Sequence, residues 1–233
     1  MITIAKKVIS VIEFLLIVIT ISNCSISNYP IVEKKKEDKL AAKLNKLLYY
    51  DLFPSEDNSL FDSIWLNGKN QEALLFIVSQ ERYNEFVRVL ASEILYEKKA
   101  DYPTPNLKDV LSHIYPKALE IAGNNESRFS GNLWGFMYHT DKFGINDFGI
   151  LGKHLIEIGK VCIPYLAKRL NNNNLLIYEG SRDATTGNML KYRVKDAAAY
   201  YIGKLANIPV QFYENHADRD AEIERLKEKL KNQ

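Results

Sequence analysis

The chain has 233 residues, of which 46% are hydrophobic and 26% are charged. This composition excludes an intrinsically disordered protein and is sufficient for one or two folded domains. The 31 basic and 29 acidic residues leave a net charge of +2, which argues against a nucleic-acid-binding protein, because such proteins carry a larger and clustered basic excess.

The first 23 residues are typical of a signal peptide for export. Lys6 and Lys7 precede an apolar stretch, residues 8–21, that is too short to span a bilayer comfortably. The segment ends in Ile21-Ser22-Asn23-Cys24, which resembles the lipobox of bacterial lipoproteins, with Asn23 where the family has Gly, Ala or Ser. The resemblance implies that Cys24 is the lipidated first residue of the mature chain. An uncleaved N-terminal anchor and simple secretion are the alternatives.

The same resemblance implies a protein of the bacterial cell envelope, attached to a membrane through the lipid on Cys24, on its periplasmic or surface face. Residues 24–38 then form the lipidated N-terminus and a polar tether, and residues 39–233 form the folded domain. With Cys24 lipidated, only Cys162 is left, so an internal disulfide is excluded. Because Cys162 lies in the apolar run VCIPYL, we expect a buried hydrophobic residue there.

From residue 40 onward, hydrophobic spacing predicts helices almost throughout and hence an all-α fold. The first helical signal consists of Leu40, Leu44, Leu47 and Leu48, and residues 54–58 end it. Further helices are expected over 71–79, 85–98, 107–122, 147–158, 164–170, 193–206 and 217–231. Pro116 should bend or split the helix at 107–122. We expect at most one small β-hairpin, with arms at 175–179 and 189–194 and a polar turn over 180–188.

Residues 156–170 read IEIGKVCIPYLAKRL and contain two residues that interrupt helices. Glycine commonly ends a helix and proline commonly opens one, so Gly159 and Pro164 predict two helices joined by a tight, buried turn, residues 161–163. Helices joined by so short a link must pack against each other. Such a link resembles those between the units of HEAT-like repeats.

Two further segments carry the resemblance to HEAT-like repeats. Second helices of these repeats typically read Val-Arg-x-x-Ala-small-x-apolar-apolar, and the segments that begin at Val87 and Val194 fit, the second with Lys195 in place of Arg. The resemblance implies a short α-solenoid of about three helical pairs: 71–79 with 85–98, 107–122 with 147–158, and 164–170 with 193–206. Ala91 and Ala198 should be buried between layers, and the helix at 217–231 should cap the stack.

Two long insertions, residues 123–146 and 171–192, interrupt the second and third pairs. Because these pairs are consecutive, we expect the insertions to lie side by side, within about 10 Å. Long insertions on a rigid scaffold often carry function. We hypothesise a composite binding site with an aromatic floor and charged rims, formed by Trp134, Tyr138, His139, Asp141, Tyr178, Glu179, Arg182 and Asp183. The alternative is that the insertions only cover apolar helix edges.

The sequence contains no GxSxG, Walker or GxGxxG motif, and no pair of histidines has the spacing of a helix-borne zinc site. We therefore predict no catalytic residue, no metal site and no cofactor, and we expect His154 and Glu157 to make a surface contact. The leading hypothesis is an interaction module for an unknown protein or peptide partner, with no role for nucleic acid. The runner-up is an envelope hydrolase with a loop site around His139, Asp141, Arg182 and Asp183.

Overall fold

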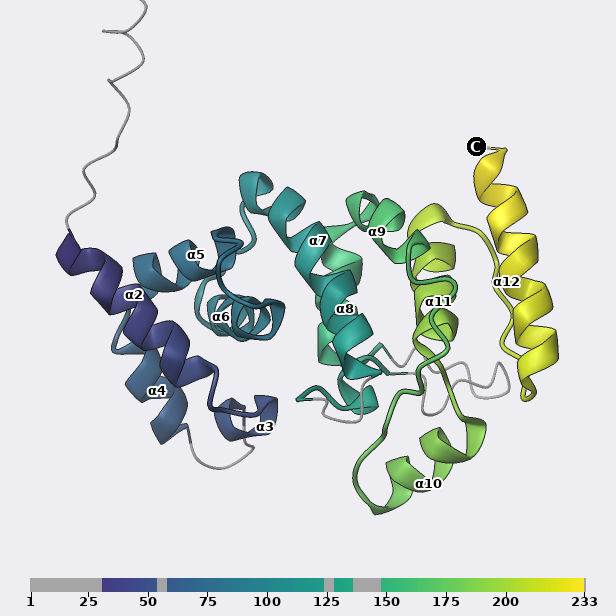
Figure 1. Ribbon diagram of the computed structural model, residues 1–233, viewed down its shortest axis with the longest axis horizontal. Coiled ribbons are helices and arrows are strands. Elements are labelled where there is room, and N and C mark those ends of the chain that lie inside the picture. The colour runs from purple at the N-terminus through teal and green to yellow at the C-terminus, as the bar shows by residue number, and fades with distance from the viewer. Residues whose placement is uncertain (1–30, 54–57, 124–127, 136–147, 233) are drawn as a thin grey trace, which may run out of the picture. The chain divides into compact units, whose positions relative to one another are not determined.

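A computed structural model describes residues 31–53, 58–123, 128–135 and 148–232 (Figure 1). The chain forms two units, Met1–Lys36 and Glu37–Gln233, and the buried core belongs to the second. The signal segment and Cys24 lie outside the described residues. Within the described ranges, no helix is long and apolar enough to cross a membrane.

The described chain is predominantly helical, which confirms the all-α prediction. Two single turns of 3₁₀ helix, Gly131–Leu133 and Lys160–Cys162, lie between the α-helices. In chain order the helices are α2 (Ile31–Leu44), α3 (Tyr49–Leu52), α4 (Ser59–Trp65), α5 (Gln71–Ser79), α6 (Glu85–Lys98), α7 (Pro105–Ala122), α8 (Gly149–Ile158), α9 (Ile163–Ala167), α10 (Ser181–Leu190), α11 (Val194–Ala206) and α12 (His216–Lys231).

Gly159 and Pro164 act as the sequence predicted. Gly159 ends α8 with a φ of 102°, and its N–H donates to the Leu155 carbonyl at 3.3 Å, while Pro164 lies in the first turn of α9. The expected buried turn is wrong in one respect, because Val161 is exposed and Cys162 is buried. A 3₁₀ turn advances about 120° per residue, so one side chain in three faces the core.

Pro116 does not split α7, which runs without a break past it. Of the two expected outcomes, a bend or a split, the split is therefore wrong. Proline inside a helix removes one backbone hydrogen bond and costs about 3 kcal/mol. Here Tyr115, Ala118 and Leu119 are all fully buried around the proline, and the burial of this face offsets the loss.

The β-hairpin that the sequence allowed is not formed among the described residues. Among the described residues, a single antiparallel bridge between Leu175 and Arg193 stands in its place, and the predicted polar turn forms most of α10. The Asn188 side chain accepts a hydrogen bond from the Tyr178 N–H and donates one to the Tyr178 carbonyl, both at 3.0 Å. The Asn188 side-chain amide thus bonds both backbone polar groups of Tyr178, which a second strand would otherwise bond. The backbone pairing of this segment is therefore limited to the Leu175–Arg193 bridge.

The predicted helix pairs are in contact with each other: α5 with α6, α7 with α8, and α9 with α11. Helix α7 also packs on α6, α9 and α11, and so connects the pairs. Ala91 on α6 and Ala198 on α11 are fully buried, as predicted. Small side chains at such positions let neighbouring helices approach closely.

Helix α12 contacts α11 through apolar and ionic interactions. Ile223 and Leu226 are buried, whereas most of the helix is polar. The carboxylate of Asp196 on α11 accepts hydrogen bonds from Arg193 at 2.7 Å and from Arg219 on α12 at 2.7 Å. Because these three side chains are almost fully buried, each charge needs the others as partners. A polar helix is thereby held on the end of the core.

Leucine in place of Ala91 or Ala198 is expected to lower the free energy of unfolding by about 1–3 kcal/mol, because the larger side chain has no room in a buried helix contact. Ala42→Leu is the matched control, since Ala42 is exposed on α2, and should change stability by less than about 0.5 kcal/mol. Urea denaturation measures all three variants. Unchanged stability of both buried variants would contradict this packing.

Candidate functional site

Residues 128–135 of the first insertion lie directly against the second insertion. The Gly131 N–H donates to the Ile177 carbonyl at 2.6 Å. The Asn132 side chain donates to the Glu179 carbonyl at 3.0 Å and accepts from the Glu179 N–H at 2.8 Å. The prediction that the insertions lie side by side is confirmed for these residues.

Tyr178 is the residue on which the two insertions pack. Its ring is 2% exposed and lies against two glycines, one from each insertion. A Cβ atom at Gly131 would approach the ring to 2.9 Å, and one at Gly187 would overlap it. The Tyr178 hydroxyl donates to the Gly135 carbonyl at 2.9 Å. The sequence pattern gave no sign of this fit, because the two glycines are distant in the chain.

A second tyrosine, Tyr201 on α11, holds the backbone on both sides of residues 136–147. Its hydroxyl lies within hydrogen-bonding distance of the Trp134 carbonyl and, at 3.1 Å, of the Phe148 carbonyl. Gly152 on α8 makes room for this hydroxyl, since a Cβ there would overlap it. Trp134 itself is fully buried. The expected aromatic floor is therefore corrected: Trp134 and Tyr178 are packing residues of the interior.

The remaining candidate residues fall into two groups. Tyr138, His139 and Asp141 lie outside the described residues, and so do the side chains of Arg182 and Asp183 in the first turn of α10. The hydrolase site around them stays a prediction. Glu179 is described, and its exposed side chain lies beside the contact between the insertions.

Sequence reasoning missed an exposed apolar surface next to these insertions. Five of the eight large hydrophobic side chains that are exposed among the described residues belong to α3, the residue before it, and the second insertion. We call this surface the apolar strip. It consists of Leu48 (51% exposed), Tyr50 (45%), Leu175 (40%), Ile177 (42%) and Met189 (69%).

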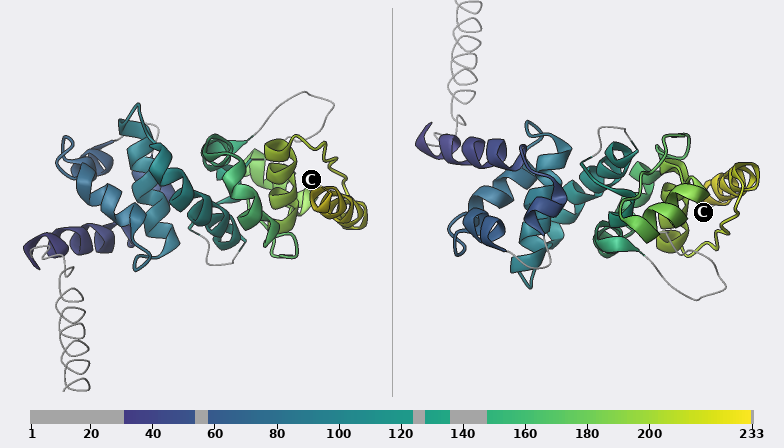
Figure 2. Two further views of the ribbon diagram at one scale, coloured as in Figure 1. Left: turned by 90° about the horizontal axis from the view of Figure 1, so that it is seen from above. Right: turned by 90° about the horizontal axis from the view of Figure 1, so that it is seen from below.

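Hydrogen bonds connect the parts of the apolar strip. The Tyr50 hydroxyl lies 2.9 Å from the Ser130 hydroxyl, and the next residue, Gly131, bonds to Ile177. Met189 follows Asn188, whose amide holds Tyr178. Helices α3 and α10 accordingly lie toward the same edge of the domain, the lower edge in Figure 1 and the near side in the right-hand view of Figure 2.

The local sequence explains why apolar residues face outward here. Leu175 and Ile177 alternate with Leu176 and Tyr178, which are buried. In an extended segment successive side chains point to opposite sides, so an all-apolar run must expose every second residue when one side packs on the core. The run LLIY was the one signal in the sequence that could have revealed the surface.

A buried hydrogen-bond network lies beneath α3 and centres on Glu93 of α6. The Glu93 carboxylate accepts from the Tyr49 hydroxyl at 3.3 Å, from the Tyr115 hydroxyl, and lies 2.7 Å from His154 Nδ1. Burial and the charge of Glu93 raise the pKa of both tyrosines, so both hydroxyls keep their protons and donate. His154 also stacks on Tyr96, with ring centroids 3.7 Å apart.

This network corrects the expected contact between His154 and Glu157. His154 turns toward α6 and pairs with Glu93, whose side chain is 1% exposed. A carboxylate so far from solvent needs several donors, and the network provides them. We assign it a structural role.

The described residues offer neither a reactive thiol nor a group of metal ligands. Cys162 is fully buried, as predicted, and burial raises the pKa of its thiol to about 12, so the reactive thiolate is scarce at neutral pH. In the described part of the chain, no three His, Cys, Asp or Glu side chains are arranged to hold a metal ion.

Trp134→Ala is expected to lower the free energy of unfolding by about 3–5 kcal/mol, because it empties a fully buried site. Glu179→Ala, which removes an exposed side chain beside the same contact, should change stability by less than about 0.5 kcal/mol. Chemical denaturation of both variants measures the difference. A Trp134→Ala variant as stable as the wild type would contradict the burial of Trp134 and would restore it as a candidate binding residue.

Comparison with models of known protein families found no match for this chain. Comparison with curated proteins and with solved structures found none either. The chemistry of the described residues and the N-terminal sequence therefore carry the functional proposal.

Proposed function

We propose that this chain is a lipid-anchored protein of the bacterial cell envelope whose HEAT-like helical domain binds a protein or peptide partner through the apolar strip. The lipobox-like segment that ends at Cys24 supports the anchor. Contact within each helix pair and the burial of Ala91 and Ala198 support the HEAT-like assignment.

The apolar strip is the observation that carries the proposal. Exposed hydrophobic side chains are ordinary when they stand singly, as at the residue after α4, on α8 and in the turn before α9. The apolar strip instead gathers five exposed hydrophobic side chains on segments that hydrogen bonds link, and large exposed apolar areas mark interaction sites. The strip joins α3 to an insertion more than a hundred residues later, so it is a product of the fold and not of one local sequence.

The strip is also held in one shape, which favours binding. Tyr178, directly after Ile177, is fixed between Gly131 and Gly187, and Tyr50 is held by Ser130. A surface that is ordered before the partner arrives loses less conformational entropy on binding. The partner that fits is a segment with apolar side chains along one face, whose burial on the strip supplies the driving force.

The anchor predicts a specific chemical modification. A fatty-acid probe fed to cells should label the wild-type chain and not Cys24→Ala, and the labelled chain should begin at Cys24. Mass spectrometry of the mature N-terminus checks both points. Recovery of a mature chain that still carries residues 1–23 would refute the lipoprotein assignment.

If the apolar strip binds the partner, a charged substitution within it should abolish binding. Ile177→Asp places a charge in the strip and should reduce capture of the partner from solubilised envelopes about tenfold or more, because a carboxylate would have to be desolvated in the interface. Val161→Asp is the matched control, since Val161 is an exposed apolar residue (48%) outside the strip. Quantitative mass spectrometry of both captures, after equal melting temperatures have been established, measures the ratio. The same partner at the same yield with both variants would remove the strip from the binding surface.

A further inference from the structure

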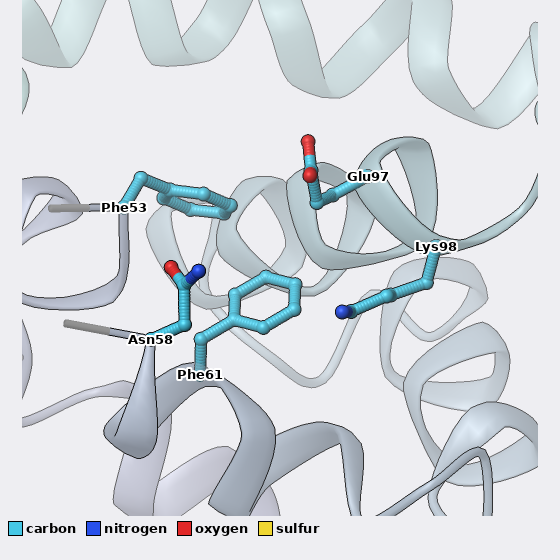
Figure 3. Close-up of a pocket in the computed structure, with 5 residues that line it drawn as sticks. All are labelled: Phe53, Asn58, Phe61, Glu97 and Lys98. Atoms are coloured by element: carbon cyan, nitrogen blue, oxygen red, sulfur yellow. The ribbon is translucent and has the colours of Figure 1, made fainter. Parts of the chain in front are cut away.

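A hollow of about 180 Å³ opens where α3, α4 and α6 meet (Figure 3). Its walls come from the residue after α3, from the start of α4 and from the end of α6. The lining residues are Phe53, Asn58, Phe61, Glu97 and Lys98. Ligand sites for drug-sized molecules usually measure about 300–1,000 Å³, so this hollow has room for one side chain.

The charges around the hollow favour a cation. The Lys98 ammonium lies 4.8 Å from the centre of the Phe61 ring and 3.5 Å from the Asp62 carboxylate, so its charge is already matched. Glu97, by contrast, has no hydrogen-bond or ion-pair partner within the described ranges. One carboxylate is therefore in excess beside the Phe53 ring, whereas Lys98 already lies over the Phe61 ring, and aromatic faces attract cations.

The two aromatic rings that line the hollow are held in place by contacts with the core. Phe53 stacks on Tyr49, with ring centroids 4.6 Å apart, and the Tyr49 hydroxyl donates to the buried Glu93. Phe61 is 3% exposed and packs edge-on against Phe53 at 5.5 Å. The hollow is thus formed before any ligand enters, which lowers the cost of binding.

We infer that this hollow receives an arginine side chain of the partner that binds the apolar strip. A guanidinium is planar, stacks on an aromatic ring and pairs with a carboxylate through two parallel N–H bonds, which an ammonium cannot do. Tyr50 of the strip and Phe53 of the hollow are three residues apart along α3 and its end, so one short segment reaches both. The inference rests on the proposed function and adds a basic residue next to the apolar face of the partner.

The test uses a capped arginine, acetyl-arginine N-methylamide, and the full chain in detergent micelles. Acetyl-citrulline N-methylamide is the neutral probe of the same shape. We expect the ring signals of Phe53 and Phe61 to shift with arginine in NMR spectra, with binding at least fivefold weaker for citrulline. Glu97→Gln should weaken arginine binding about fivefold or more, and Glu81→Gln, which removes an exposed carboxylate from the turn before α6, should not.

Equal shifts with arginine and citrulline, or equal losses in the two variants, would overturn the inference. Because this titration needs no partner, its result is separate from that of the partner capture. If Ile177→Asp abolishes capture and arginine does not bind, only the hollow is refuted. If Glu97→Gln weakens arginine binding and Ile177→Asp leaves capture of the partner unchanged, the hollow stands as a guanidinium site and the strip is refuted.

Discussion

The position of the helices around the proposed binding surface depends on one buried carboxylate, that of Glu93. Helix α6 carries it, and α3, α7 and α8 each supply a hydrogen-bonding partner: Tyr49, Tyr115 and His154. A buried polar group that loses its partners costs about 1–3 kcal/mol or more, so these helices keep the register in which all three partners reach it. Tyr49 also backs Phe53. The Tyr49–Glu93 hydrogen bond thereby fixes α3 on the core, and with it the hollow and the α3 residues of the apolar strip.

The rest of the strip depends on two tyrosines that hold the insertions. Tyr178 fills the space that Gly131 and Gly187 leave, and Tyr201 holds the backbone at Trp134 and Phe148. Long loops usually carry function because a rigid scaffold positions them. Here Trp134 and Tyr178 are buried and belong to the scaffold, whereas Leu175 and Ile177, which alternate with Leu176 and Tyr178, are exposed.

Local patterns predicted what depends on local physics. Helices α5 and α6 begin and end at the predicted residues, and Gly159 ends α8, because periodicity and backbone freedom act over a few residues. Contacts between distant residues were beyond such patterns. His154 pairs with Glu93 and not with its neighbour Glu157. The Asn188 side chain bonds the backbone N–H and carbonyl of Tyr178, where a hairpin would have placed a second strand. The insertions were therefore correctly expected side by side, whereas the burial of Trp134 and Tyr178 was not foreseen.

The most direct test of the central claim, that the apolar strip is the partner-binding surface, is photo-crosslinking in living cells. A benzophenone amino acid at position 177 should give one discrete adduct with a partner protein after irradiation. The same group at position 153, an exposed lysine on α8, should not give that adduct. An identical adduct pattern from both positions, or none from position 177, would contradict the account.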